Sequence, residues 1–493
     1  MTASIPRNDG PGATSQQSQP RPALNGRLGV AGIMFMVIAA AAPLTVIGGD
    51  GLLAIADGPG PGAPVGFLIA GFLLLLFAVG FVTMTPFVPE AGAFFSYINV
   101  GLGPRWGLGA AFTALVTYTA IQVGMYGYMG WALNDLIVFY GGPSLPWWFW
   151  AFSILLLVGV LGYRNIELSS KVLGLALILE IAVVVILDAV VFIQGGEEGI
   201  SGTSFSLDAV SSGPLGIAVL FAFAGFMGFE ATAVFRDEAR TPDRTIPRAT
   251  YLSVAVVGVF YTVSCWAIVE AWGPSNVKEV VSQSLASDGN ALLDTAELYV
   301  GSTFRDFMQI LLVTSLFACI LSFHNVISRY QFNLAGNGLL PKTLASVHQT
   351  ENSPHISSLV QSATALILIV VLAGAGLDPL VGVFASMAGI STVGMILLLI
   401  LTSISVLNFF RRNTTARDGR VVTTYLVPAL STAGMCVALY LVLSNFTMVT
   451  DKSLLVSAML ASVPVIALVV GLCSRMSSRL VAASSAEDGS RNG

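Results

Sequence analysis

Long apolar runs separated by short polar stretches dominate the pattern along this chain. A helix needs about 20 apolar residues to cross the hydrocarbon core of a bilayer. Twelve runs approach or exceed this length, and they predict an all-α polytopic membrane protein. The first, third and eighth runs are long, which predicts either a tilt or a break. The twelve runs cover residues 28–56, 64–86, 106–139, 147–163, 168–194, 212–236, 249–272, 304–331, 355–376, 380–408, 422–444 and 453–474.

The first and sixth runs are interrupted near their middles. The first contains Pro43 and then the glycine-rich stretch Gly48–Gly51, which includes a carboxylate. The sixth contains Gly225 and Gly228, followed at once by Glu230. Proline removes a backbone donor and glycine permits non-helical angles, so both runs are predicted to be discontinuous helices.

These two runs occupy matching places, because each is the first member of a block of five runs. Interrupted helices at corresponding positions of two halves indicate the binding site of an inverted-repeat transporter. Free N–H groups at a break suit an anion, and free carbonyls suit an ammonium group. An α-amino acid carries both charges. The alternative for the sixth run alone is a flexible membrane helix with a buried, protonated Glu230.

Composition supports a membrane protein and narrows its chemistry. The chain is 55% hydrophobic and 10% charged, whereas soluble domains carry roughly 25% charged residues. The four cysteines and three histidines show no metal-ligand spacing, and no phosphate-binding GxxxxGK[ST] motif is present. We therefore expect no metal, no cofactor, no nucleic-acid partner and no enzymatic activity.

The basic residues predict the orientation. With the N-terminus in the cytoplasm, 19 of the 22 Lys and Arg residues fall in cytoplasmic segments, as the positive-inside rule requires. Both termini are then cytoplasmic. We expect disordered tails at 1–25 and 477–493, a transport core at 26–410 and two accessory spans within 411–476. The 273–303 connection is the longest outer loop and is expected to cover the outer vestibule.

Several motifs together make the chain resemble an amino acid permease of the amino acid–polyamine–organocation superfamily. They are the GGDG stretch of the first run and three longer segments, which read PEAGAFFSYINVGLG (Pro89–Gly103), GFEATAVFRDEARTPDRTIPRA (Gly228–Ala249) and SRYQFNLAGNGLLP (Ser328–Pro341). The resemblance implies the leucine-transporter fold, which is a 5+5 inverted repeat here followed by two accessory helices.

The resemblance also implies roles for residues at the two breaks. The backbone N–H groups of the first break would receive the substrate carboxylate, and the backbone carbonyls of the second would receive its amino group. An aromatic residue near the second break would cap the pocket, and both Phe223 and Phe226 are candidates. The residues concerned are Ile47, Gly48, Gly49, Asp50 and Gly51 in the first break and Phe223, Ala224, Gly225, Phe226 and Gly228 in the second.

The chain departs from that family in two places. Asp50 puts a negative charge where a substrate carboxylate is expected, and together with Glu230 it could favour a cationic amine or polyamine. Some relatives carry a lysine midway along the fifth span, where this chain has Glu180. A carboxyl within a membrane span can serve as a proton carrier, so Glu180 and Glu230 are the coupling candidates. The alternative for Glu180 is an interhelical hydrogen bond. Asp188, nearer the outer end, is expected at the interface.

The third run adds a polar and aromatic stripe. Tyr118, Gln122 and Tyr126 follow one another at i, i+4 and i+8 and therefore share one helix face. Such a stripe lines either a pocket or a helix-packing seam. We list Tyr118 and Gln122 as candidates for substrate binding.

These patterns predict a secondary active transporter in the plasma membrane. It would move an amino acid or a related amine or polyamine by alternating access, coupled to protons that a carboxyl carries. The alternative is a membrane-embedded ligand sensor with a transporter-like body. The identity of the substrate, symport against antiport, proton against sodium coupling and the oligomeric state stay open.

Overall fold

The described part of the protein consists almost entirely of helices. The structure is a computed structural model, and it describes residues 29–88, 94–164, 170–230, 232, 239–336, 338–349, 353–417, 419–450 and 452–474. The expected tails at 1–25 and 477–493 lie outside the described residues, as does most of the segment between Glu230 and Arg240.

The predicted membrane spans are confirmed. Ten helical segments of the described chain are long and apolar enough to cross a bilayer, and two shorter apolar helices, Trp147–Tyr163 and Leu215–Gly225, match the fourth and sixth runs. The ten are Val30–Ala56, Gly60–Phe87, Pro104–Phe139, Gly174–Gln194, Arg244–Trp272, Ser302–Gly336, His355–Gly374, Pro379–Arg412, Val422–Ser444 and Leu454–Cys473.

Most spans are single helices. They are α4 (Ala63–Met84), α6 (Pro104–Phe139), α7 (Trp147–Tyr163), α8 (Ser170–Gln194), α12 (Pro242–Trp272), α15 (Ser302–Gly336), α16 (His355–Gly374), α17 (Ala385–Arg412), α19 (Val427–Ser444) and α21 (Leu454–Cys473). The long third and eighth spans, α6 and α15, are unbroken helices of 36 and 35 residues. At 1.5 Å per residue, each exceeds the roughly 30 Å hydrocarbon core, so tilt or protrusion, and not a break, explains their length.

The first and sixth spans are divided. The first consists of α1 (Val30–Ala40), α2 (Pro43–Val46), the π-helical turn η1 (Ile47–Gly51) and α3 (Leu52–Ala56). The sixth begins as α10 (Leu215–Gly225), and turns follow it as far as Glu230. Two discontinuous helices at the heads of two five-span blocks are the arrangement that the sequence predicted.

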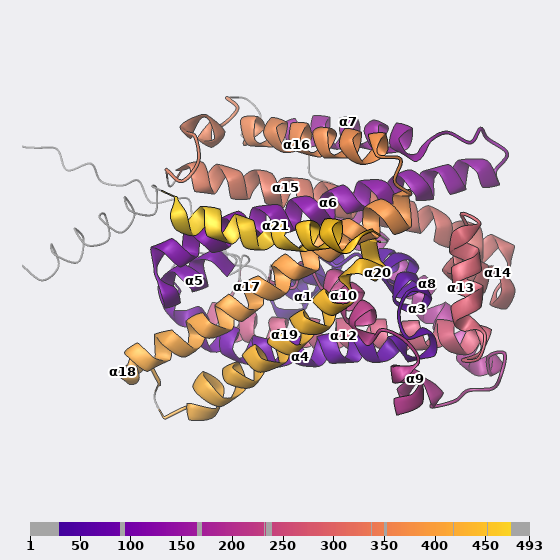
Figure 1. Ribbon diagram of the computed structural model, residues 1–493, viewed down its shortest axis with the longest axis horizontal. Coiled ribbons are helices and arrows are strands. Elements are labelled where there is room, and N and C mark those ends of the chain that lie inside the picture. The colour runs from indigo at the N-terminus through magenta and orange to yellow at the C-terminus, as the bar shows by residue number, and fades with distance from the viewer. Residues whose placement is uncertain are drawn as a thin grey trace, which may run out of the picture.

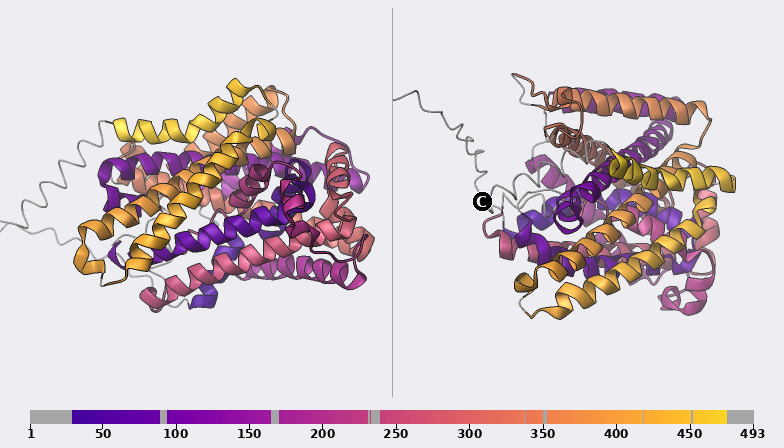
Figure 2. Two further views of the ribbon diagram at one scale, coloured as in Figure 1. Left: turned by 60° about the horizontal axis from the view of Figure 1, so that its bottom comes forward. Right: turned by 60° about the vertical axis from the view of Figure 1, so that its left-hand side comes forward.

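The two ends of the bundle differ (Figure 1). The helices α9 (Leu207–Ser211), α13 (Val277–Ala286) and α14 (Ala291–Tyr299) gather at one end, on the right of the view. The helices α5 (Phe94–Leu102) and α18 (Thr414–Arg417) lie at the other. We call these the α13–α14 end and the α5 end. The further views show the long helices running between the two ends (Figure 2).

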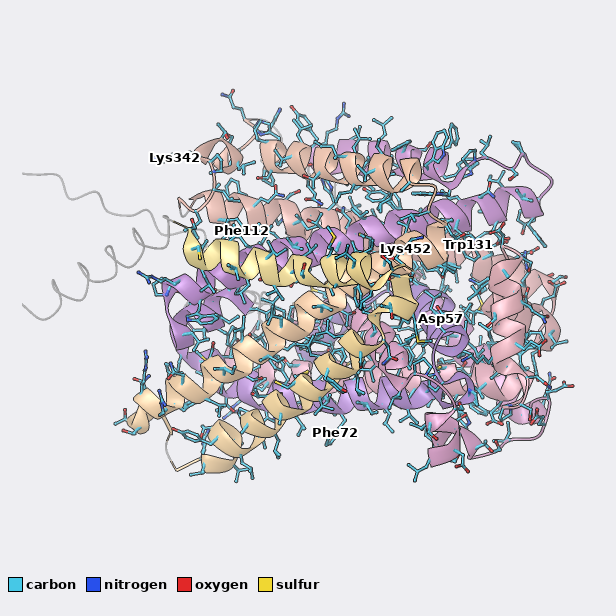
Figure 3. All side chains as sticks on the ribbon, in the orientation of Figure 1. Asp57, Phe72, Phe112, Trp131, Lys342 and Lys452 are labelled. Atoms are coloured by element: carbon cyan, nitrogen blue, oxygen red, sulfur yellow. The ribbon has the colours of Figure 1, made fainter. Side chains whose placement is uncertain are left out.

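The flanks of the bundle are apolar, as a lipid-facing surface requires. Phe72 points outward from α4 (Figure 3), and 59% of it is exposed. Lys342 lies at the α5 end (Figure 3). The helices α19 and α21 also expose large apolar side chains, including Tyr440 at 70% and Met459 at 61%. Exposed apolar side chains on the flanks and charged groups at the ends fit a protein that crosses the membrane along its long helices.

Close packing around α10 fixes the position of the broken spans. The helix α10 packs against α4, α17, α19 and the turn η1. A Cβ atom added to Gly66 of α4 would lie 2.7 Å from the backbone of Ala218, and one added to Gly225 would lie 2.6 Å from Cγ1 of Val46. Glycine therefore allows the sixth span to approach both the second and the first, and the two interrupted helices are in direct contact.

This contact gives a testable coupling between Gly225 and Val46. Gly225→Ala should lower the melting temperature of the purified protein by several degrees, because overpacking costs about 1–3 kcal/mol. Adding Val46→Ala removes the opposing methyl groups, so the double variant should be more stable than the sum of the single changes predicts.

Gly202→Ala is the matched control, because no other atom lies within 4 Å of its added Cβ. Purely additive effects of Gly225→Ala and Val46→Ala would contradict a direct contact between the first and sixth spans.

Candidate functional site

The break of the first span lies at Ala41 and Ala42. Ala42 adopts a left-handed conformation, with φ 45° and ψ 68°, which ends the helical path from α1. Pro43 explains this position, because a residue before proline is disfavoured in the α region and proline itself has no N–H. The helix then restarts at Pro43, so the N–H groups of Leu44 and Thr45 stand in its first turn without helical partners.

We expected the interruption at the glycine-rich stretch Ile47–Gly51, and its position differs in the structure. These five residues form the π-helical turn η1, which continues into α3. Their N–H groups are therefore largely engaged within the helix. The glycines permitted a break, but the proline imposed one five residues earlier. A role for Ile47, Gly48, Gly49, Asp50 and Gly51 in substrate binding stays a prediction.

The break of the sixth span begins at Gly225. Successive tight turns follow it, in which Met227 N donates to Ala224 O at 3.2 Å and Phe229 N donates to Phe226 O at 3.3 Å. Gly228 has φ 103°, a conformation that favours glycine. The stretch from Phe223 to Gly228 thus includes the end of α10 and the non-helical backbone after it.

Tyr261 of α12 joins the two breaks. Its hydroxyl donates to the backbone carbonyl of Ala41 at 3.2 Å, and its ring meets that of Phe226 with centroids 5.7 Å apart. Of the two candidate capping residues, Phe226 therefore lies against the tyrosine that bonds the first break. Phe223 is buried in α10, with 1% exposed.

Glu230 closes the turn after the second break. Its Oε1 accepts a hydrogen bond from the Tyr118 hydroxyl at 2.6 Å, and its Oε2 accepts one from Gly228 N at 3.0 Å. Hydrogen bonds to a carboxylate are among the stronger ones in proteins. The structure thus brings together Tyr118 of α6 and Glu230, which the sequence proposed separately for binding and coupling.

Gln122, one turn further along α6, is held by other helices. Its Nε2 donates to Ile320 O at 3.3 Å, and its Oε1 accepts from Gln361 Nε2 at 2.7 Å. Gln361 in turn accepts from Gln331 Nε2 at 3.3 Å. This network connects α6 to α15 and α16. For Gln122, it corresponds to the alternative in which the polar stripe of α6 forms a helix-packing seam. A direct role of Gln122 in substrate binding stays a prediction.

Glu180 of α8 is joined to the first span by two hydroxyl groups. Ser315 of α15 donates to Glu180 Oε2 at 2.8 Å, and Thr45 of α2 donates to Ser315 Oγ at 3.1 Å. All three residues are buried. The Glu180 carboxyl is therefore connected through Ser315 to Thr45, which is the second residue after Pro43.

Asp188 is the second carboxyl of α8, and its expected place at the membrane interface stays a prediction. Only 7% of it is exposed, and its Oδ2 accepts from Ser264 Oγ of α12 at 2.6 Å. The serine supplies a partner between the helices, which the position of Asp188 along the sequence did not reveal.

Asp50 differs from these carboxyls. Only 1% of it is exposed, and its Oδ1 has no hydrogen-bond partner within the described part of the chain. The turn η1 that carries Asp50 packs against α10, α12 and α14.

The helices α13 and α14 cover Asp50 and its neighbours from the α13–α14 end. Asn290 Nδ2 donates to Gly48 O at 3.2 Å, while its Oδ1 accepts from Leu292 N at 3.0 Å and so caps α14. Lys278 Nζ donates to Gly58 O at 2.7 Å. The sequence indicated a covering loop but missed Asn290, whose only sequence signal is that of an ordinary helix cap.

The pKa of Asp294 in this cover is raised from its ordinary value, mainly because burial disfavours its charge. Ser284 donates to its Oδ2 at 2.8 Å and opposes that rise. The bond joins α13 to α14 and keeps the two helices of the cover together. Among the described residues, no group of three or more His, Cys, Asp or Glu side chains is placed to hold a metal ion.

Comparison with known proteins places these features in a family. A model of the family "Amino acid permease" matches residues 32–476. The chain is 25% identical to the gamma-aminobutyric acid permease of Escherichia coli, over 72% of this chain and 75% of the relative. It is 22% identical to the serine/threonine exchanger SteT of Bacillus subtilis, over 62% and 67%. It is 23% identical to the low-affinity putrescine importer PlaP of Escherichia coli, over 68% and 73%.

The two roles of Asn290 can be separated by one substitution. Asn290→Asp keeps the oxygen that caps α14 but loses the amide that donates to Gly48 O. The loss of a hydrogen bond worth about 1 kcal/mol should raise the population with the cover detached about fivefold. We expect faster modification of the buried Cys319 by a small water-soluble thiol reagent, measured at that residue by mass spectrometry.

Asn276→Asp is the control, because Asn276 precedes α13 and makes no side-chain cap. Like Asn290→Asp, the Asn276→Asp variant adds one negative charge to the cover formed by α13 and α14, but it does so away from Gly48. Equal labelling rates at Cys319 in the wild type and Asn290→Asp would show that the Asn290 bond does not hold the cover.

Proposed function

Because this chain belongs to the amino acid permease family, we propose that it is a secondary active transporter which moves an amino acid or a related amine across the plasma membrane by alternating access. The protein is a multi-pass membrane transporter and not an enzyme. The observation that carries the proposal is the direct contact between the two interrupted spans, at Gly225 against Val46. Such a junction leaves backbone groups in the bundle interior that a small solute can satisfy.

The substrate site in this proposal lies at the junction. The N–H groups of Leu44 and Thr45 begin the helix that restarts at Pro43, and this end of a helix favours an anion. The carbonyls at the end of α10 favour an ammonium group. Tyr261, bonded to Ala41 and packed on Phe226, links the two sides. This arrangement moves the expected carboxylate position from Ile47–Gly51 to the turn before it.

Glu180 is the first proposed coupling residue. When the carboxyl is ionised, Ser315 donates to it and Thr45 donates to Ser315. When Glu180 takes up a proton, it becomes a donor itself, and the direction of hydrogen bonding along this chain can reverse. Thr45 adjoins the break of the first span, so the protonation state of Glu180 changes the contacts between that span and α8 and α15. A proton can thus bias the balance between the two access states.

Glu230 is the second proposed coupling residue. Both of its oxygens accept hydrogen bonds, from Tyr118 and from the backbone of Gly228. Protonation removes one accepting position and weakens the closure of the turn after α10. The sixth span would then change shape at its break while the scaffold helix α6 stays in place.

The orientation follows from the distribution of basic residues along the chain. We place the α13–α14 end outside the cell and both termini in the cytoplasm, because 19 of the 22 Lys and Arg residues then lie in cytoplasmic segments. The cover formed by α13 and α14 becomes an outer closure of the substrate site.

The proposal is tested with the purified protein in liposomes. Candidate substrates are first screened by thermal shift with amino acids and small amines, and the best compound is then followed in uptake and counterflow. Counterflow of labelled substrate is expected. Binding without counterflow would identify a ligand sensor and contradict transport.

Proton coupling is tested separately by Glu180→Gln and Glu230→Gln. Each variant should lose most of the stimulation of uptake by an inward-directed proton gradient, because glutamine keeps the size of the side chain but cannot ionise. Counterflow of the same substrate should persist. Glu279→Gln, on the exposed face of α13, serves as the control and should behave as the wild type.

Undiminished stimulation by the proton gradient in both Glu180→Gln and Glu230→Gln would remove these residues from the coupling mechanism. It would leave the transport activity itself intact.

A further inference from the structure

All three histidines of the sequence lie in one region, where α7 ends and α16 begins. His324 of α15 is fully buried, and its Nε2 lies 2.8 Å from Oγ of Ser358 in the first turn of α16. His355 is the first residue of α16, and its ring centroid lies 5.2 Å from that of His348. Both of these rings pack against Tyr163, the last residue of α7. The helix α16 begins toward the α5 end of the protein (Figure 1).

Two glycines of α7 make room for polar side chains in this region. A Cβ atom added to Gly162 would lie 2.5 Å from Nε2 of His324 and 3.0 Å from Oγ of Ser358. One added to Gly159, a turn earlier, would lie 3.1 Å from Oγ of Ser362. The helix α7 therefore approaches α15 and α16 where these two helices carry an imidazole and hydroxyl groups, and not where they are apolar.

Several polar atoms on this side of α15 and α16 have unused hydrogen-bonding capacity. His324, Ser328 and Gln331 follow one another at i, i+4 and i+7, so they share one face of α15. Nδ1 of His324, Oγ of Ser328 and Oε1 of Gln331 are buried and have no hydrogen-bond partner in the described chain. The same holds for Oγ of Ser362 and Nδ1 of His355. Buried polar atoms are normally satisfied by protein or by bound water, so such a row of atoms calls for water.

These side chains form what we call the polar seam. Its members are His324, Ser328 and Gln331 of α15 and Ser358, Gln361 and Ser362 of α16.

The polar seam leads from the α5 end toward Glu230. The glutamine network of Gln122 joins the seam to α6. Tyr118 lies one turn before Gln122 on the same face of α6, and its ring centroid lies 6.3 Å from that of Phe323, the residue before His324. The hydroxyl of Tyr118 donates to Glu230. The seam therefore comes close to the hydrogen bond that holds the proposed coupling carboxyl.

His324 is the titratable member of the polar seam. The helices α7 and α16 contain no Asp or Glu. The acids of α6 and α15 are Asp135 and Asp306, which lie near the α13–α14 ends of these helices. Besides the other two histidines and Tyr163, the described ionisable side chains toward the α5 end of the seam are Arg164, Arg329, Tyr330 and Lys342. An ionisable side chain within membrane spans often marks a proton relay.

We propose that the polar seam is a hydrated path along which the coupling proton passes from Glu230 to the cytoplasm, with His324 as its relay. This inference rests on the proposed transport function and on the cytoplasmic placement of the α5 end. It gives the proton an exit of its own, because the seam lies between α7, α15 and α16, whereas the two breaks lie at α2 and α10.

The transfer conserves protons at each step. Glu230 gives its proton to the oxygen of Tyr118 as Tyr118 gives its hydroxyl proton to bound water. The water protonates Nδ1 of His324, and Nε2 releases its own proton to Oγ of Ser358, whose hydroxyl proton passes to water at the α5 end. One proton leaves the carboxyl and one enters the cytoplasm. Tyr118 and Ser358 are neutral again, and the imidazole has changed its tautomer.

The water is tested by X-ray hydroxyl-radical footprinting of the full-length protein in lipid nanodiscs, read by mass spectrometry. Radicals that form from bound water modify adjacent side chains even where these are buried. We expect modification of His324 and Tyr330 well above that of Phe77, after correction for the intrinsic reactivity of each residue type. Phe77 is the control because it is buried and its ring packs against the rings of three other phenylalanines.

The relay is tested with His324→Gln in liposomes. The probes are labelled gamma-aminobutyric acid, L-serine and putrescine, and the one with the fastest counterflow in the wild type is used. Glutamine can hydrogen-bond to Ser358 but cannot take a proton at one nitrogen and release it from another. Uptake driven by an inward-directed proton gradient should fall about tenfold, while counterflow at equal pH should stay within twofold of the wild type.

A pair of serine variants provides the matched control. Ser328→Ala removes a hydroxyl of the polar seam, and Ser431→Ala removes one from α19; both hydroxyls are buried and have no partner in the described chain. Ser328→Ala should slow proton-driven uptake, and Ser431→Ala should behave as the wild type. Ser358→Ala replaces His324→Gln in the transport test if the glutamine variant does not yield a monodisperse protein.

Two results would overturn the proton path and leave transport standing. One is modification of His324 no greater than that of Phe77. The other is proton-driven uptake within twofold of the wild type in both His324→Gln and Ser328→Ala. An equal loss of counterflow and of proton-driven uptake in His324→Gln would assign it a structural role and would also contradict the relay. Absence of counterflow in the wild type would instead contradict the transport function itself.

Discussion

Backbone hydrogen bonds that a helix leaves unmade must be satisfied by something other than lipid. In this protein two such interruptions lie next to each other, because the first span breaks at Ala42 and the sixth breaks after Gly225. The missing side chain of Gly225 lets the sixth span contact Val46. Tyr261 satisfies the carbonyl of Ala41, and Glu230 satisfies the N–H of Gly228. The remaining groups at the junction are those that a solute can use.

Interior polar residues surround this junction and connect it to the scaffold. Tyr118 reaches the second break from α6. Ser315 and Thr45 connect the first break to Glu180 on α8. At the α13–α14 end, Asn290 joins the cover to Gly48 in the same span. The first span is thus connected to Glu180 through Ser315, to the cover through Asn290 and to the sixth span through Val46. A change at any one of these contacts can act on the others through this divided helix.

The sequence predicted the large features because lipid imposes strong constraints on composition. The number of spans, the two interrupted helices and the family follow from apolar runs and a few motifs. The position of the first break did not follow, since Pro43 and the glycines of Gly48–Gly51 both disfavour helix and the sequence alone does not rank them. The sequence also did not reveal hydrogen-bond partners that are far apart along the chain. Nothing near Asp188 indicates Ser264, and nothing near Gln122 indicates Gln361, although these contacts decide whether each side chain faces lipid, a neighbouring helix or a pocket.

The central claim is that substrate binds where the two divided spans meet, and amide hydrogen exchange measures this most directly. The protein is compared by mass spectrometry with and without the compound that stabilises it most. The account predicts slower exchange at Leu44 and Thr45, in the first turn after Pro43, and in the turns from Phe226 to Glu230, both at once. Protection confined to other helices, with unchanged exchange at both breaks, would contradict it.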